Sequence, residues 1–150
     1  IFGKAEAGKS TLMSTLIPGS INIHHKGRTI AMDFGTINYN GHELHFYGTP
    51  GQARFECLRD IIALKADMAI MVFDGSTGID QQDRAILDEV KALGVPFIGV
   101  LNHKPQGPRT SHDEVRALCS RYKGLVTVLE GSVKDRAFTR TLLEHIIKVS

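Results

Sequence analysis

The sequence predicts an α/β fold, with a mostly parallel six-stranded sheet, one antiparallel edge strand and about five helices. The first observation is that short apolar stretches of strand type alternate with helical patterns along most of the chain. The second is the unbroken apolar run Met68–Phe73, which is typical of a strand buried on both faces of a parallel sheet. A chain of 150 residues, 42% of them hydrophobic, can bury one core, so a single domain over residues 1–150 is expected.

The start of the chain is expected to hold a strand end, a helix and a loop. Ile1-Phe2 have the character of the tail of a strand, which predicts a first strand truncated at the N-terminus. A helix is predicted from about Ser10 to Leu16, because Pro18-Gly19 cannot continue it. The next stretch, Ser20–Arg28, is polar and is predicted to be a loop.

A β-hairpin follows this loop. Apolar residues alternate with smaller or polar ones from about Ile30 to Tyr39, which predicts a strand. Asn40-Gly41 is the strongest two-residue hairpin signal. The chain is therefore expected to return through Glu43–Tyr47 as an antiparallel neighbour.

The rest of the chain alternates helices with strands, of which those at 68–73 and 97–101 are expected to be buried. Strands are predicted at 68–73, 97–101 and 125–129. Helices are predicted at 51–66, from Asp80 to a stop at Gly94, from a capping box at Ser111–Glu114 to about Tyr122, and at 137–149.

Charge and cysteine content exclude several classes of protein. The 18 Lys and Arg residues nearly balance the 16 Asp and Glu residues, which gives no reason to expect a nucleic-acid partner. Cys57 and Cys119 have no Cys or His at zinc-binding spacing, so neither a disulfide framework nor a zinc site is expected and a cytoplasmic setting fits best. No apolar run reaches the roughly 18 residues of a transmembrane helix, so no integral membrane segment is predicted.

The most specific signal is a phosphate-binding loop between the first strand and the first helix. It reads Gly3-Lys4-Ala5-Glu6-Ala7-Gly8-Lys9-Ser10, followed by Thr11, and it matches G-x-x-x-x-G-K-[ST] in full. The glycines let backbone amides turn toward a phosphate, and the helix N-terminus adds partial positive charge. Lys9 is expected to reach the terminal phosphates and the Ser10 hydroxyl to ligate Mg²⁺. The expected architecture is thus the three-layer sandwich of P-loop NTPases.

Further motifs follow the phosphate loop in a recognisable order. They are Arg28–Phe34 at the entry to the second strand, Gly48–Phe55 after the hairpin, Asn102–Pro105 after the fifth strand and Gly131–Lys134 after the sixth. In order and spacing the chain resembles a Ras-like small GTPase domain of the P-loop GTPase superfamily over almost its whole length. The segment Gly48–Phe55 corresponds to the switch II of that family, and its Pro-Gly-Gln is similar to a bacterial and archaeal group of the family.

The resemblance implies a set of roles around GTP or GDP and Mg²⁺. Thr29 would complete the Mg²⁺ shell with Ser10 and sense the γ-phosphate. The amide of Gly51 would contact the γ-phosphate, and Gln52 would orient the attacking water. Arg28 is the nearest candidate for an arginine finger supplied within the chain. Read without the resemblance, Thr29 is a β-branched residue opening a strand, and Gln52 and Arg28 are solvated side chains.

Switch II departs from the family pattern at one position. The family has an Asp that holds Mg²⁺ through water, and this chain has Gly48 there. Asp33 on the neighbouring strand or Asp74 at the end of a buried strand are the acids available to replace it, or each is an ordinary strand-end or capping Asp. Weaker Mg²⁺ binding or slower hydrolysis is the expected consequence.

The base-recognition loop departs further. Of the family's N-K-x-D, only Asn102 is in register; His103 replaces the Lys, Lys104 is one place late and Pro105 replaces the Asp. Proline cannot imitate a carboxylate that accepts two hydrogen bonds from guanine, so selectivity is expected to relax by roughly a few kcal/mol. His103 or Lys104 is expected to cover the ring face. By resemblance, the segment Ser132-Val133-Lys134 offers a backbone amide to the guanine oxygen.

The leading hypothesis is a Mg²⁺-dependent switch that binds and hydrolyses GTP, slowly without a partner, and is read by a protein effector and by regulators. The first alternative is a degenerate nucleotide-binding or interaction module that does not hydrolyse. The second is an ATP-using P-loop protein.

Overall fold

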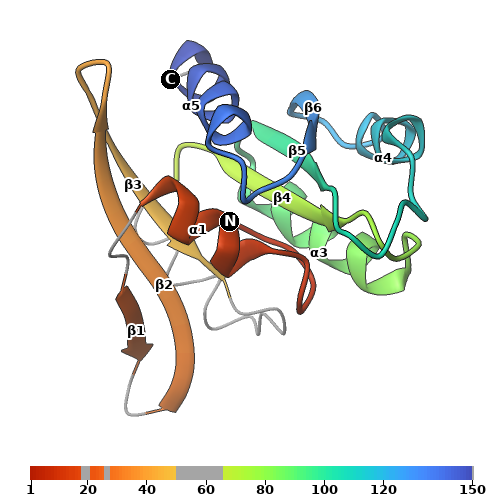
Figure 1. Cartoon of the computed structure of the whole chain (residues 1–150), viewed down its shortest axis with the longest axis horizontal. Helices are drawn as coiled ribbons and strands as arrows, with labels where there is room; N and C mark the ends of the chain where they lie inside the picture. Colours follow the sequence, from red (N-terminus) through yellow and green to blue (C-terminus); the bar gives the residue numbers. More distant parts are fainter. Residues whose placement is uncertain (18–20, 26–27, 50–65, 150) are drawn as a thin grey trace.

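The computed structural model describes residues 1–17, 21–25, 28–49 and 66–149, with the backbone alone for residues up to 33 in the second and third of these ranges (Figure 1). Four helices and six strands lie in these ranges. In chain order they are α1 (Lys9–Leu16), β1 (Ile21–His25), β2 (Arg28–Tyr39), β3 (His42–Gly48), β4 (Ala69–Asp74), α3 (Gln81–Leu93), β5 (Phe97–Asn102), α4 (His112–Cys119), β6 (Leu125–Gly131) and α5 (Arg136–Val149).

Two three-stranded sheets form the framework. In one, β1, β2 and β3 pair antiparallel; in the other, β4, β5 and β6 pair parallel. Ile1 and Phe2 lie between them: the Thr49 amide donates to the Ile1 carbonyl at 2.9 Å, and the Phe2 amide donates to the Ile70 carbonyl at 2.7 Å. Backbone hydrogen bonds therefore run across the chain from the antiparallel hairpin to the parallel strands.

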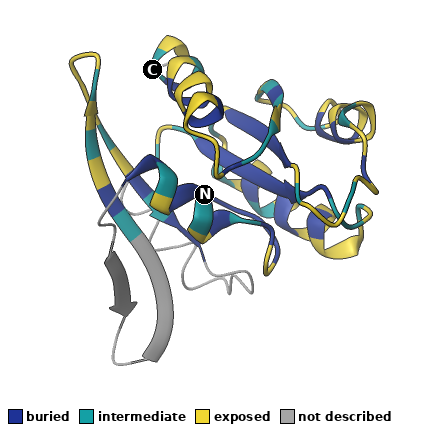
Figure 2. Cartoon of the chain, viewed as in Figure 1, coloured by how far each residue is buried: buried dark blue, intermediate teal, exposed yellow. Residues whose placement is uncertain are grey.

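Two of the parallel strands, β4 and β5, form the buried centre predicted from their apolar runs. All residues of β4 and β5 are buried. Successive side chains of a strand point to opposite faces. Ile70 and Val72 accordingly belong to a cluster with α1 and α5, and Met71 and Phe73 belong to a cluster with α3 and α4. Helices thus cover both faces of the sheet, with exposed residues on their outer sides (Figure 2).

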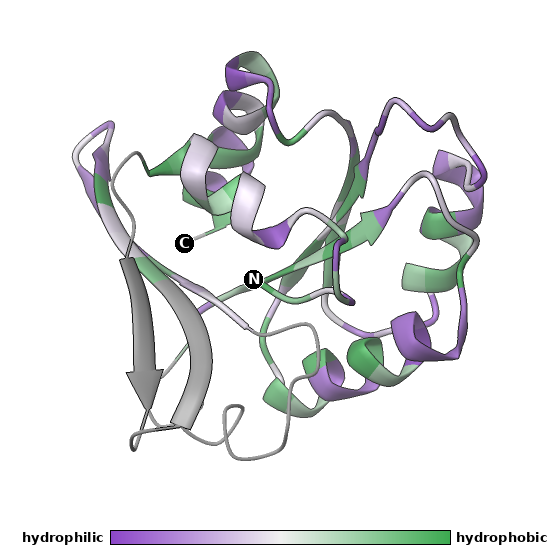
Figure 3. Cartoon of the chain, turned by 60° about the horizontal axis from the view of Figure 1, so that its bottom comes forward, coloured by the Kyte–Doolittle hydropathy of each residue, from purple (hydrophilic) through white to green (hydrophobic). Residues whose placement is uncertain are grey.

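The helices have the mixed hydrophobic and hydrophilic composition of elements that cover a sheet (Figure 3). The predicted end signals are confirmed. Asp80 caps α3 with a complete capping box, and Gly94 ends that helix in the left-handed conformation with φ 68°. Ser111 accepts a hydrogen bond from the Glu114 amide at the start of α4.

The predicted hairpin is confirmed in register and turn. β2 pairs with β3 from Asp33 opposite Gly48 to Tyr39 opposite His42. Asn40 and Gly41 both have positive φ, 49° and 80°, as a two-residue hairpin turn requires.

The sequence prediction was wrong at three places, and a fourth prediction lies outside the described residues. The strands form two three-stranded sheets rather than one six-stranded sheet. Part of the polar stretch predicted as a loop forms β1, so the hairpin sheet has two antiparallel pairs rather than one edge strand; isoleucine alternates with polar residues at 21–24, a strand pattern that the high polarity obscured. α4 ends at Cys119 rather than near Tyr122. The helix predicted at 51–66 lies almost entirely outside the described residues. No helix among the described residues is long and apolar enough to cross a membrane.

Candidate functional site

The phosphate loop connects Phe2, beside β4, to α1. Its two glycines stand where a side chain has no room: a Cβ on Gly3 would lie 2.7 Å from the Val72 carbonyl, and a Cβ on Gly8 would lie 2.5 Å from Asn102 Nδ2. Gly8 also has φ 117°, and Glu6 has φ 64°. The loop is therefore pressed against the ends of β4 and β5 in a conformation that its sequence pattern permits.

Lys9 lies folded inside the loop. Its Nζ donates to the Gly3 carbonyl at 2.5 Å and to the Lys4 carbonyl at 2.9 Å, and the residue is 8% exposed. Burial lowers the pKa of Lys9 from 10.5 to about 8. A buried ammonium with a lowered pKa gains strongly from an anion, because the anion replaces the solvation that burial removed.

The N-terminus of α1 adjoins this ammonium. Gly8 is its N-cap and supplies no side-chain hydrogen bond to the first amides of the helix. Free amides and the helix dipole at such a terminus favour a phosphate. Ser10 is exposed and Thr11 is half-buried in the first turn, so the Ser10 hydroxyl is accessible from solvent.

Asn102, at the end of β5, joins three separate segments. Its Nδ2 donates to the Ala7 carbonyl of the phosphate loop at 3.0 Å, and its Oδ1 accepts from the Val133 amide at 3.1 Å. The side chain is buried, with the residue 3% exposed. The predicted base loop and the segment after β6 are thus held against the phosphate loop by one amide group.

Lys104 also reaches the phosphate loop. Its Nζ donates to the Glu6 carbonyl and, at 2.9 Å, to Asp74 Oδ2. Burial alone would raise the pKa of Asp74, but hydrogen bonds from Ser76 and from Lys104 outweigh burial and lower it. His103 lies elsewhere, with Nε2 3.2 Å from Glu130 Oε2 on the surface. Of the two residues predicted to cover the base, Lys104 is the one beside the loop.

The family model described as "50S ribosome-binding GTPase" matches residues 1–103, which include the phosphate loop and Asn102. The chain belongs to this family of P-loop GTPases.

The chain is also similar to individual curated proteins. An uncharacterised protein of Methanocaldococcus jannaschii is 32% identical over 120 residues, which are 80% of this chain and 77% of that protein. Translation initiation factor IF-2 of Clostridium botulinum is 30% identical over 157 residues, and that match covers 98% of this chain and 22% of the factor. The chain thus spans less than a quarter of the initiation factors that it matches.

Solved structures show the same GTPase fold. The G domain of the T. maritima FeoB iron transporter superposes with a TM-score of 0.76 at 19% identity, covering 99% of this chain and 94% of that one. The bacterial selenocysteine-specific elongation factor EF-Sec gives 0.75 at 23% identity, covering 99% of this chain and 27% of the factor. These likenesses establish the α/β G-domain fold.

The switch residues predicted for this GTPase are placed only in part. Arg28 and Thr29 open β2, where Arg28 pairs with His25 of β1. The register of the hairpin sets Asp33 opposite Gly48. Gly51 and Gln52 lie outside the described residues, so their roles stay predictions.

The donors for a metal ion are few. Among the described residues no three His, Cys, Asp or Glu side chains come together as a metal site. This donor set fits Mg²⁺ carried by a nucleotide, since Mg²⁺ keeps several waters and takes most of its other ligands from phosphate. Ser10 is the hydroxyl available for such an ion beside the loop.

Sequence reasoning missed the ion pairs that join the phosphate loop to the start of α3. Lys4 Nζ lies 3.2 Å from both Asp80 Oδ2 and Asp83 Oδ2, at the start of α3. The pattern Asp80-x-x-Asp83 signals a helix start, but no local pattern links it to a lysine 76 residues away.

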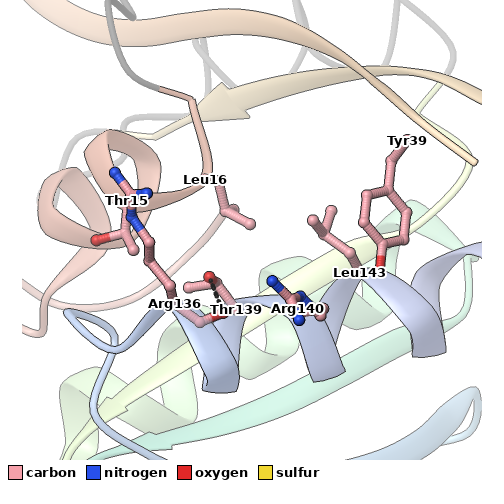
Figure 4. A pocket seen from close by; sticks show the side chains of 7 residues that line it. All are labelled: Thr15, Leu16, Tyr39, Arg136, Thr139, Arg140 and Leu143. Atoms are coloured by element: carbon pink, nitrogen blue, oxygen red, sulfur yellow. Dashed lines mark hydrogen bonds between the residues drawn. The ribbon is translucent and has the colours of Figure 1, made fainter.

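A separate groove of about 230 Å³ lies between the end of α1, the end of β2 and α5 (Figure 4). Its polar side chains come from Thr15, Tyr39, Arg136, Thr139 and Arg140. No residue predicted to bind nucleotide lines it, so the groove is distinct from the candidate nucleotide site.

Proposed function

We propose that this chain is a G domain, spanning residues 1–150, that binds GTP with Mg²⁺ and hydrolyses it as a molecular switch. The observation that carries the proposal is the Gly3–Ser10 loop, with the Lys9 ammonium buried inside it and Asn102 joining it to the base loop. Family membership supports guanine nucleotide and Mg²⁺ as ligands.

Each part of the proposed phosphate site answers one requirement of phosphoryl transfer. Lys9 and the first amides of α1 neutralise the phosphates, with Lys4, Ala5 and the other loop residues supplying backbone contacts. Ser10 and Thr29 hold Mg²⁺, which neutralises phosphate charge when bound. Gly51 contacts the γ-phosphate, Gln52 orients water, and Arg28 is the proposed internal finger, because the reaction needs positioning more than covalent help.

The proposed base site uses the two segments joined by Asn102. Lys104 stands at the phosphate loop, where its alkyl chain can lie along a nucleotide, and Val133 is held beside Asn102. Ser132 and Lys134 adjoin it, and the Lys134 amide donates to Ser132 Oγ at 3.3 Å. Guanine is the proposed base, with His103 as a further contact.

The proposed switch acts through partners. GTP orders the residues around Thr29 and Gly51, hydrolysis releases them, and a protein effector reads the difference, with regulators that set the rates. A cytoplasmic setting stays a prediction from the cysteine content; Cys119 is a free, buried thiol.

The decisive test is calorimetric titration of the purified chain with GTP, GDP, ATP and ADP, with and without Mg²⁺. Guanine nucleotides are expected to bind more tightly than adenine nucleotides, and Lys9→Ala is expected to abolish triphosphate binding while the far-UV spectrum is unchanged. Unchanged binding by Lys9→Ala would refute the phosphate site. Equal binding of ATP and GTP would refute guanine selectivity and favour an ATP-using protein.

A second function, a nucleotide-binding module without turnover, is favoured by Gly48 and Pro105. Gly48 ends β3 with no carboxylate for Mg²⁺, and Pro105 is exposed beside the base loop. Phosphate release in single-turnover assays separates the two functions. Mg²⁺-dependent release that falls in Gln52→Ala supports the switch, and absent release in the parent chain supports the module.

A further inference from the structure

Lys4 is a buried lysine of the phosphate loop whose side chain leads away from the loop. Its Nζ lies 3.2 Å from Asp83 Oδ2, 3.2 Å from Asp80 Oδ2 and 3.4 Å from the Gly78 carbonyl, and the residue is 7% exposed. All three acceptors belong to the turn and cap that begin α3. Lys4 therefore connects the loop to a helix that starts more than 70 residues later.

The two carboxylates are themselves fixed in place. Asp80 Oδ1 accepts from the Gln82 and Asp83 amides, and Asp83 Oδ2 accepts from the Asp80 amide at 3.0 Å. Asp83 is 1% exposed, and its Oδ1 has no hydrogen-bond partner among the described residues. Such a carboxylate depends on Lys4, because a buried charge without a partner is costly.

The backbone of Lys4 is equally engaged on the other side. Its carbonyl accepts from Lys9 Nζ at 2.9 Å and from the Ala7 amide at 3.1 Å. Lys4 thus accepts a hydrogen bond from Lys9 through its carbonyl and forms ion pairs with the start of α3 through its ammonium. The neighbouring Asp83 and Asp80 outweigh burial and raise the pKa of Lys4, whereas burial raises the pKa of Asp83.

We propose that Lys4 is a positioning residue: its ion pairs with Asp83 and Asp80 fix the phosphate loop against the start of α3 and so set the place of the Lys9 ammonium. The proposal rests on the proposed function in one respect, which is that Lys9 meets a nucleotide phosphate. It adds that the N-terminal end of α3 is mechanically part of the phosphate site.

The test uses Lys4→Met, which keeps the length of the side chain, and the double variant Lys4→Met/Asp83→Asn, which also removes the buried carboxylate charge and conserves the net charge. Lys91→Met, an exposed lysine of α3, is the matched control. Urea unfolding identifies the variants that fold. The double variant is expected to recover most of the stability that Lys4→Met loses, because no buried charge is left unpaired.

Two readouts then separate positioning from simple stability. In the chain without nucleotide, the Ala7 amide donates to the Lys4 carbonyl, and its hydrogen exchange is expected to quicken in the double variant as the loop leaves its place. GDP affinity of the double variant is expected to fall roughly tenfold or more, and Lys4→Arg is expected to keep more affinity than Lys4→Met. Lys91→Met should match the parent in both readouts.

Ala7 exchange that stays at its parent rate in the double variant overturns the proposal, whatever the nucleotide data show. Faster Ala7 exchange with parent affinity for GDP also overturns it, because Lys4 would then not position the phosphate site. Failure of the parent chain to bind any nucleotide refutes the proposed function instead, and in that case hydrogen exchange alone decides whether Lys4 places the loop.

Discussion

Nucleotide affinity is expected to depend on the charge of Lys9 and therefore to change as the pH is raised through 8. The ammonium is buried in the phosphate loop and has a pKa of about 8 against an ordinary 10.5. A displacement of this size corresponds to about 3 kcal/mol against the charged form. A phosphate beside Lys9 removes that penalty, so the bound state is expected to hold the proton at a pH where the free chain has lost it.

The sign of the effect follows from the order of the pKa values. The folded pKa lies below the unfolded one, so the penalty to folding is complete below about pH 8 and disappears as the pH rises toward 10.5. Nucleotide binding runs in the opposite direction, because binding needs the protonated form. Its affinity is therefore expected to decline as the pH rises above 8, by about tenfold for each pH unit.

Calorimetry in two buffers of different ionisation enthalpy measures the proton uptake directly. About 0.5 proton per GDP is expected at pH 8, where half of the free Lys9 is neutral, and about 0.1 at pH 7. The measurement at pH 7 is the internal control, since the same protein and ligand are compared. Uptake near zero at both pH values would refute the reasoning, because Lys9 would then be fully charged in the free chain or would not meet the phosphate.

Three other substitutions test separate parts of the site. Gly8→Ala should destabilise the fold by about 3 kcal/mol and abolish GDP binding, since its Cβ would meet Asn102 Nδ2 at a left-handed φ; parent values in urea unfolding and titration would contradict this. Asn102→Ala should cost about 3 kcal/mol by leaving the Ala7 carbonyl and the Val133 amide unpaired, and an unfolding midpoint equal to the parent's would show that water replaces both bonds. Arg28→Ala should slow single-turnover GTP hydrolysis about a thousandfold with GDP affinity unchanged; equal rates would remove the proposed finger.

The predictable part of the fold consists of elements whose signals are local. Asn40-Gly41 fixed a two-residue turn because both positions require positive φ, and the register of β2 with β3 followed. Asp80 and Gly94 bounded α3 in the same way, through a side chain that caps and a residue that accepts the left-handed region. The phosphate loop combined local glycines with a strand and a helix on either side, so its place in the fold was predictable as well.

The unpredicted parts depend on partners distant in sequence. β1 exists through pairing with β2, and isolated strand propensity in a polar stretch does not reveal such a neighbour. The contact of Lys104 with the Glu6 carbonyl spans 98 residues, and the sequence predicted for this lysine only a place at the ring face of the base. The loop after β5 brings Lys104 to the phosphate loop all the same, with Asp74 as its second partner.

We expect phosphate binding and base reading to be physically separable in the proposed site, because of the place of Asn102. Asn102 holds the phosphate loop and the segment after β6 through two buried hydrogen bonds that involve no base. Pro105 replaces the base-reading carboxylate three residues later, at an exposed position. Loss of that carboxylate therefore removes a contact to the ligand and leaves intact the bonds that shape the phosphate loop. Affinity should then come mainly from the phosphates, and the choice between guanine and adenine should be the property in which this GTPase differs most from relatives that keep the carboxylate.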